Sequence, residues 1–266
     1  MKDYNNAESS PVEGTAPAGN RKFKKSKWIL ATLATVLLAG LGLACYGYEQ
    51  FLADNVNSAS EEQLVQFPSG SNLEDIANIL HQKKILKNKN SFLFAASWMN
   101  YKGKAGQYRL PIAVRNNRQL IRILRRQQEP VRVTFNNIRK IEQLGALVCK
   151  NLEMDSLELN NLLANDAYIK ALGYNRQTLM SLFIPNTYEF YWTTTARDFV
   201  RRMQKEHKKF WNEKKFAEET RRARAEALGW SPEQVYTLAS IVETETQHHP
   251  EKRRIAGVYV NRLKKN

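Results

Sequence analysis

The chain has 266 residues, of which 42% are hydrophobic, and a formal net charge of +15 at pH 7. This hydrophobic share excludes a disordered chain and allows a buried core. The positive surplus favours anionic polymers or lipids as partners, but the basic residues are spread over many segments, so a dedicated nucleic-acid reader is disfavoured and no nucleic-acid partner is expected.

The N-terminal region predicts a membrane anchor. Residues 1–27 are expected to be a disordered cytoplasmic tail, because 1–20 are rich in Ser, Pro, Gly, Ala and Asn. Residues 28–48 carry no charge, and a helix of this length spans about 31 Å, which matches a bilayer core of about 30 Å. A cleaved signal peptide or a lipoprotein signal at Cys45 fits less well, because no good cleavage site precedes it.

Charge on either side of this helix predicts its direction. Basic residues precede it: Arg21, Lys22, Lys24, Lys25 and Lys27. Acidic residues follow it: Glu49, Asp54, Glu61 and Glu62. Positive charge stays on the cytoplasmic side. We therefore expect a single-pass protein of a cell inner membrane, with a cytoplasmic N-terminus and a periplasmic C-terminal part.

The exported part is predicted to be α+β. Residues 49–130 form a small module of short strands with covering helices. Residues 131–266 form a second, mainly helical domain. In the module, strands are expected at 61–67 and 105–110, and helices at 73–80 (capped by Ser71 or Asn72), 91–101 and 117–127. In the second domain, a strand is expected at 131–135, and helices at 139–152, 156–172, 197–217, 218–228, 232–246 and 250–265.

The stretch 181–192 combines Pro185 with many aromatic residues. It is too aromatic for a solvated linker, which predicts a packed loop or strand. Such a stretch is often plain core. It also suits a sugar cleft, because aromatic faces stack on pyranose rings while polar groups fix their orientation.

The helix at 232–246 contains the strongest candidate for chemistry. Ser231 with Gln234 forms a capping box and Pro232 suits the first helical position. Glu243 lies on the flank of the predicted buried stripe, beside Tyr236 and Ser240. A carboxyl group there is partly removed from water, which favours the protonated form that a general acid needs, although such a residue is more often solvated or ion-paired. The stripe consists of Val235, Leu238, Ala239 and Val242.

These residues resemble a known family. The run 238–246, followed by 255–263, is similar to the signature of the endolytic murein transglycosylases, the MltG/YceG-like family. The run 184–188 resembles that family's Pro-Asp-Thr-Tyr element, with Asn186 where Asp is usual. The resemblance spans nearly the whole chain. It implies a LysM-like module at 49–130 and a transglycosylase domain at 131–266.

The resemblance also implies a reaction without cofactor or metal. Glu243 matches the family's catalytic acid, which cleaves the MurNAc–GlcNAc bond of peptidoglycan glycan strands and leaves a 1,6-anhydro end without consuming water. Penicillin-binding proteins or other cell-wall synthases are candidate partners. Family members continue beyond the position of Asn266, so a truncated chain with weak or no activity is expected. Candidate substrate-binding residues are Tyr188, Glu189, Asn186, Tyr236, Ser240, Glu245 and Asn261.

Other readings of the sequence remain. Glu245 and His248 have the Glu-x-x-His spacing of di-iron bundles, but the chain offers no second such motif. Cys45 and Cys149 lie in different segments and offer neither a disulfide framework nor a thiolate zinc site. A non-enzymatic alternative is a membrane-anchored glycan-binding or scaffold protein of cell-wall synthesis. The module at 61–110 is alternatively a rigid spacer.

Overall fold

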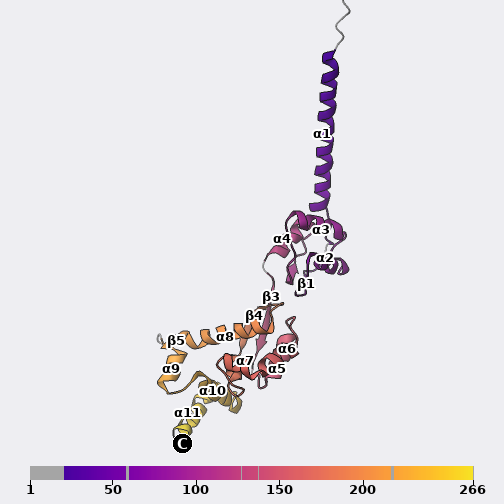
Figure 1. Cartoon of the computed structure of the whole chain (residues 1–266). Coiled ribbons are helices and arrows are strands. Elements are labelled where there is room, and N and C mark those ends of the chain that lie inside the picture. The colour runs from indigo at the N-terminus through magenta and orange to yellow at the C-terminus, as the bar shows by residue number, and fades with distance from the viewer. Residues whose placement is uncertain (1–20, 58–59, 127, 137, 217–218, 266) are drawn as a thin grey trace, which may run out of the picture.

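The structure is a computed structural model and describes residues 21–57, 60–126, 128–136, 138–216 and 219–265. The fold is mixed α+β and mostly helical (Figure 1). The predicted tail at 1–20 lies outside the described residues.

The helices are α1 (Arg21–Phe51), α2 (Leu73–Gln82), α3 (Lys89–Trp98), α4 (Asn117–Arg125), α5 (Ile141–Cys149), α6 (Ser156–Ala164), α7 (Asp166–Ala171), η1 (Leu179–Leu182), α8 (Ala196–Asn212), α9 (Arg221–Ala227), α10 (Pro232–Glu245) and α11 (His249–Lys265). The strands are β1 (Gln63–Phe67), β2 (Gly106–Leu110), β3 (Pro130–Phe135), β4 (Asn186–Tyr191), β5 (Lys214–Phe216) and β6 (Glu219–Thr220).

Helix α1 projects away from the rest of the protein (Figure 1). It begins at Arg21, so residues 21–27, predicted to belong to the disordered tail, are helical. An 18-residue window within its segment Lys27–Phe51 has a mean hydropathy of 2.1, and none of that window is buried against other parts of the protein. By length and composition this segment is able to cross a membrane, which is consistent with a single-pass anchor.

The first folded unit follows α1 and has its own core. Strands β1 and β2 pair antiparallel, with Gln63 opposite Leu110 and Phe67 opposite Gly106. Helices α2 and α3 lie between these strands in sequence, and α4 follows β2. Asn72, one of the two predicted caps, forms a capping box with Asp75. The fully buried side chains of this core include Phe67, Ile76, Leu80, Phe92, Leu120, Ile121 and Leu124.

The second folded unit contains a separate core. Strands β3 and β4 pair antiparallel, with Phe135 opposite Asn186. The Pro-aromatic stretch therefore supplies a strand, and its alternate residues Tyr188 and Phe190 are buried. The Phe190 ring lies 5.1 Å from the Phe199 ring of α8, between centroids. The remaining core comes from α5 to α8 and η1.

Ser69 and Glu153 join the two units directly. Ser69, in the turn after β1, donates from its backbone N to Glu153 Oε1 (2.8 Å) and from Oγ to Glu153 Oε2 (2.6 Å). Glu153 follows α5, and its own backbone N donates to the Trp192 carbonyl at 2.9 Å. The first unit thus contacts the second at the end of the β3–β4 ladder.

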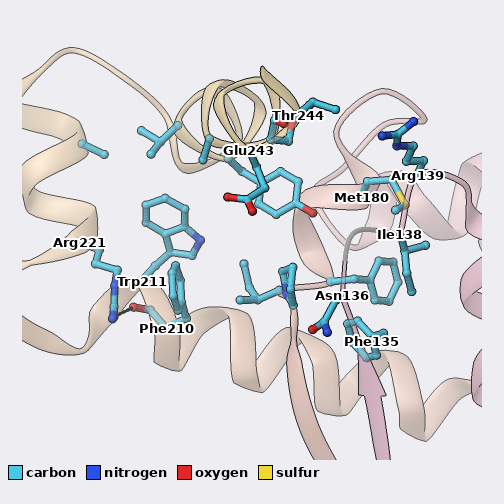
Figure 2. A pocket seen from close by; sticks show the side chains of 18 of the residues that line it. Phe135, Asn136, Ile138, Arg139, Met180, Phe210, Trp211, Arg221, Glu243 and Thr244 are labelled. Carbon is cyan, nitrogen blue, oxygen red and sulfur yellow. Dashed lines mark hydrogen bonds between the residues drawn. The ribbon is translucent and has the colours of Figure 1, made fainter. Parts of the chain in front are cut away.

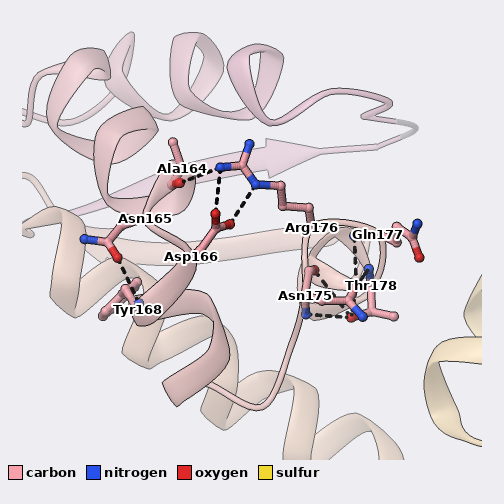
Figure 3. Close-up of polar contacts among 8 residues, drawn as sticks. All are labelled: Ala164, Asn165, Asp166, Tyr168, Asn175, Arg176, Gln177 and Thr178. Atoms are coloured by element: carbon pink, nitrogen blue, oxygen red, sulfur yellow. Dashed lines mark hydrogen bonds and ion pairs between the residues drawn. The ribbon is translucent and has the colours of Figure 1, made fainter.

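Two predicted helices differ from the structure. The segment 156–172 is split at Asn165, whose extended backbone ends α6 and whose side chain caps α7 by accepting from Tyr168 N (Figure 3). Asparagine favours this role because its side chain satisfies an unpaired helix N–H. The segment 197–217 remains helical only to Asn212 and is followed by the short β5–β6 pair.

Candidate active site

A pocket of about 1240 Å³ opens in the second unit beside α10. Its opposite wall comes from the end of β3 and the segment after it, and from η1 and the segment that precedes β4. Helices α8 and α9 complete it. Segments far apart in the sequence therefore meet there. The residues contributed outside α10 are Phe135, Asn136, Ile138, Arg139, Met180, Phe183, Ile184, Pro185, Phe210, Trp211, Arg221, Arg224, Ala225 and Leu228.

Helix α10 supplies one side of the pocket. Its start is set by the predicted capping box, in which Ser231 accepts from Gln234 N and the Gln234 side chain accepts from Ser231 N. Its pocket-lining residues recur at helical spacing, so one face of α10 borders the pocket. They are Val235, Tyr236, Ala239, Ser240, Glu243 and Thr244, and Gln247 in the turn after the helix also lines the pocket.

The predicted buried stripe of α10 was partly wrong. Val242 is buried, but Ala239 is exposed and Val235 and Leu238 are half-buried. Val235 and Ala239 line the pocket instead of the core. The hydrophobic pattern identifies an apolar face of a helix, but it does not distinguish packed core from the wall of a cavity.

Glu243 projects from α10 into the pocket, between Trp211 and Phe210 on one side and Ile138 and Met180 on the other (Figure 2). It is the one carboxylate among the described residues that line the pocket. Its side chain is 42% exposed and forms an ion pair with Lys252 of α11, which is 23% exposed. Lys252 Nζ donates a hydrogen bond to Glu243 Oε2. The carboxylate is therefore accessible from the pocket and oriented by a cation.

Aromatic rings and a guanidinium group form the wall beside Glu243. Phe210 and Trp211 of α8 meet edge to face, with ring centroids 5.5 Å apart. Arg221 lies over the Phe210 ring at 4.1 Å and donates to the Phe210 carbonyl at 2.6 Å. Trp211 is 3% exposed, and its buried Nε1 has no hydrogen-bond partner among the described residues. This wall therefore combines the half-buried Phe210 ring with a guanidinium group, a combination of apolar and polar surface that suits a carbohydrate site.

Of the predicted substrate-binding residues, Tyr236 and Ser240 line the pocket with Glu243. Burial raises the pKa of Tyr236. The Ser240 hydroxyl donates to the Thr237 carbonyl at 2.7 Å, within α10. The predicted grouping of Tyr236 and Ser240 beside Glu243 on one flank of the helix is thus present in three dimensions.

Tyr188 lies in the core beneath the pocket. Its ring stacks on Phe135 with centroids 5.2 Å apart, and its hydroxyl donates to the Ile184 carbonyl at 2.6 Å. Burial raises the pKa of Tyr188 to about 12. Because Ile184 and Phe135 both line the pocket, Tyr188 supports the pocket wall from behind.

The other four predicted residues lie outside the pocket lining. Asn186 is exposed, and its Oδ1 accepts from Thr187 N at 2.8 Å. Glu189 forms an exposed ion pair with Arg132 at 3.5 Å. Glu245 accepts from the Tyr259 hydroxyl at 3.0 Å, a bond that raises the pKa of Tyr259. Asn261 is exposed on α11.

The described residues contain no group of three or more His, Cys, Asp or Glu side chains close enough to hold a metal ion. His248 instead lies with Nδ1 3.8 Å from Glu251 Oε1. The Glu-x-x-His spacing of Glu245 and His248 falls across the end of α10 and the turn into α11.

The chain belongs to a recognised protein family. The chain is a member of the YceG-like family, whose sequence model matches residues 65–266. A relative named endolytic murein transglycosylase, from Bacillus subtilis (strain 168), is 22% identical over 239 residues, which are 82% of this chain and 64% of that protein. A crystal structure of a YceG-like protein from Listeria monocytogenes has a TM-score of 0.43 and 23% identity, over 78% of this chain and 72% of that one.

Proposed function

We propose that this protein is an endolytic lytic transglycosylase of peptidoglycan, in which Glu243 is the catalytic residue. The single observation that carries the proposal is the position of Glu243, the one carboxylate among the described pocket-lining residues, on a wall shared with aromatic rings. Membership of the YceG-like family and the name of the Bacillus subtilis relative support the same reaction class. The chain covers 64% of that relative's length.

A single carboxylate suits this chemistry. Glycoside hydrolases ordinarily use two carboxylates, one on each side of the scissile bond. A lytic transglycosylase needs one group that acts first as acid and then as base. Glu243 would protonate the glycosidic oxygen as the bond to C1 of N-acetylmuramic acid breaks. It would then take the proton from the C6 hydroxyl as that oxygen bonds to C1, which closes a 1,6-anhydro ring.

Lys252 is placed to orient the Glu243 side chain. Its ammonium group holds one carboxylate oxygen of Glu243, so the side chain is kept on the pocket side of α10. Positioning of this kind lowers the barrier by restricting the acid to productive geometries. Phe210 would supply apolar surface against which a sugar ring packs, with the buried Trp211 behind it.

The remaining parts of the proposal concern location and the first unit. Helix α1 would span a cell inner membrane with its N-terminus in the cytoplasm, which leaves both folded units in the periplasm. Residues 49–130 would act as a LysM-like glycan-binding module. The order β1, α2, α3, β2, with the two strands paired antiparallel, supports that comparison. Penicillin-binding proteins or other cell-wall synthases would be its protein partners.

The test uses the full chain in detergent, incubated with purified peptidoglycan. The released fragments are treated with borohydride and weighed by mass spectrometry, because 1,6-anhydro ends resist reduction whereas hydrolytic ends do not. We expect anhydro-ended fragments, and Glu243→Gln should lower their formation by about 10²- to 10⁴-fold, the usual contribution of a general acid.

The matched control is Glu233→Gln, which removes a carboxylate from the first turn of the same helix, outside the pocket lining. This variant should retain activity. Circular dichroism is used to check that both variants fold. Equal product from wild type and Glu243→Gln would contradict the proposal, and so would reducible ends. Binding of glycan strands by both proteins without cleavage would favour the non-enzymatic scaffold.

A further inference from the structure

An aromatic cluster joins the C-terminal end of α1 to α3. The Tyr46 and Phe94 rings meet edge to face with centroids 5.5 Å apart, and the Phe51 and Trp98 rings meet at 5.4 Å. Phe51 also contacts Phe94 at 6.2 Å. These rings are nevertheless open to the outside: Trp98 is 76% exposed, Tyr46 49% and Phe94 39%. We call Phe94 and Trp98 the α3 aromatic face.

A buried polar network holds this arrangement rigid. Asn117, at the start of α4 and 0% exposed, donates from Nδ2 to the Gln50 carbonyl in the last turn of α1 (2.7 Å) and to Ser91 Oγ of α3 (3.0 Å). Asn55 Nδ2 donates to Asn117 Oδ1 at 2.8 Å, and Asn55 Oδ1 accepts from Asn88 N at 2.7 Å. These hydrogen bonds connect the last turn of α1 to α3 and α4, and breaking them would leave buried polar groups without partners. The network therefore holds the first unit against α1.

The depth of the cluster follows from helix geometry. About 20 helical residues cross a hydrocarbon core of about 30 Å. Counted from Trp28, where the uncharged segment begins, this length ends near Tyr48. Tyr46 then lies at the outer boundary of the hydrocarbon core. Phe94 contacts Tyr46, with ring centroids 5.5 Å apart, and is therefore placed close to this boundary. Trp98 contacts Phe51, more than one turn further out, which corresponds to the headgroup region.

We propose that the α3 aromatic face is a membrane-binding surface that lies in the interfacial region of the bilayer spanned by α1. Its ligand is phospholipid, at the boundary between headgroups and acyl chains. Tryptophan and tyrosine prefer this zone because their rings are amphipathic. The proposal depends on α1 crossing a membrane and is independent of the chemistry proposed for Glu243.

A consequence concerns the orientation of the whole protein. The first unit contacts lipid through α3 and contacts the second unit through Ser69 and Glu153. The bilayer would therefore restrict the direction in which the second unit extends. A flexible tether between α1 and the first unit would impose no such restriction.

The test uses the full chain in nanodiscs of phosphatidylethanolamine and phosphatidylglycerol, with or without brominated acyl chains, which quench tryptophan fluorescence at short range. The chain has five tryptophans. The signal from one of them is the difference between the wild type and a Trp→Phe variant. The variants are Trp98→Phe, Trp28→Phe as the reference for membrane insertion, and Trp230→Phe as the reference for a tryptophan in the second unit.

We expect brominated lipid to lower the fluorescence contributed by Trp28 and by Trp98 measurably, and to leave that contributed by Trp230 nearly unchanged. If Trp28 is quenched and Trp98 is not, α1 spans the membrane but the α3 aromatic face does not contact lipid, and the proposal is overturned. A protein partner or a second copy of the chain would then be the occupant of that face. Absence of quenching at Trp28 would show that α1 does not insert, and the proposal would fail with it.

Discussion

Lys252 of α11 forms an ion pair with Glu243 of α10 across the turn that joins the two helices. The turn itself is held by side-chain contacts: the Thr246 hydroxyl donates to Glu251 Oε2 at 3.0 Å and accepts from His248 N at 3.0 Å. These bonds set the direction of α11 as it leaves the turn. The orientation of the proposed catalytic carboxylate therefore depends on the neighbouring helix as well as on its own.

We predict that Lys252→Met lowers kcat for release of anhydro-ended fragments, by up to about a hundredfold, because a mispositioned acid loses that order of rate. KM should change little, since Lys252 is not among the described residues that line the pocket. Lys252→Arg keeps the positive charge and should restore part of kcat. Unchanged kcat in Lys252→Met would show that the ion pair has no role in positioning Glu243.

Because of the buried His207, we expect the free energy of unfolding to depend on pH. It is 5% exposed on α8, its Nδ1 lies 3.4 Å from the Tyr174 hydroxyl, and burial lowers its pKa. Below the ordinary histidine pKa of about 6.5, the unfolded chain binds a proton that the folded protein does not. The free energy of unfolding should therefore fall as the pH is lowered through this range.

His207→Gln removes this titration, so its free energy of unfolding should depend less on pH than that of the wild type. Urea unfolding followed by fluorescence, at about pH 7.5 and about pH 5.5, measures the difference. His81→Gln is the control, because His81 is exposed in the first unit. An equal decrease in the wild type and His207→Gln would contradict the prediction.

The Arg176–Asp166 pair offers a second titration, at acid pH (Figure 3). Arg176 donates to both carboxylate oxygens, at 2.7 and 3.1 Å, and to the Ala164 carbonyl at 3.2 Å. These hydrogen bonds hold the pKa of Asp166 below its ordinary value. In Arg176→Gln, the pKa of Asp166 should rise toward that value, as measured by NMR titration of the side-chain carboxyl.

The sign of the stability effect follows from the lowered pKa of Asp166. The pair stabilises the fold above the pKa of the unfolded carboxyl, and this stabilisation is lost as the pH falls through the folded pKa. Arg176→Gln should therefore be less stable than the wild type near neutral pH and similar to it in strong acid. Lys170→Gln removes a cation from the same helix and should leave the pKa of Asp166 nearly unchanged; a comparable rise there would mean that general charge, not the pair, is responsible.

Because the two folded units have separate cores, we expect a substitution in one core to destabilise that unit alone. Leu124 and Leu144 are both fully buried, one in each cluster. Leu124→Ala and Leu144→Ala should each cost about 2–5 kcal/mol in the unit that contains the substitution. Hydrogen exchange followed by mass spectrometry should show faster exchange in that unit alone. Loss of protection in both units from either substitution would show that they unfold as one.

Much of the local structure is predictable from the sequence, because it depends on nearest neighbours along the chain. Asn72 and Ser231 each cap a helix through residues three positions away. The break at Asn165 was missed, although an N-cap residue stands there, because the apolar period continues through it. The β4 strand remained open between loop and strand, since its partner β3 lies far away in the sequence.

In the candidate site, too, some residues could be identified from the sequence and others could not. Glu243, Tyr236 and Ser240 were identifiable from their spacing on one helix and from the family signature. Phe210, Trp211 and Arg221 were not assigned to the site, because α8 and α9 reach the pocket only through packing. Their sequence offers one weak signal, two adjacent aromatic residues near the end of an otherwise basic helix.

The sequence by itself predicted the apolar N-terminal helix, many of the elements and the start of α10, and it singled out Glu243 as the candidate, since each depends on composition, spacing or a local motif. The tertiary structure alone decided that Val235 and Ala239 border a cavity and that Lys252 holds the carboxylate. It also decided that α3 rests against the end of α1. These relationships join residues from different elements, and an apolar or charged side chain has no partner until the chain has folded around it.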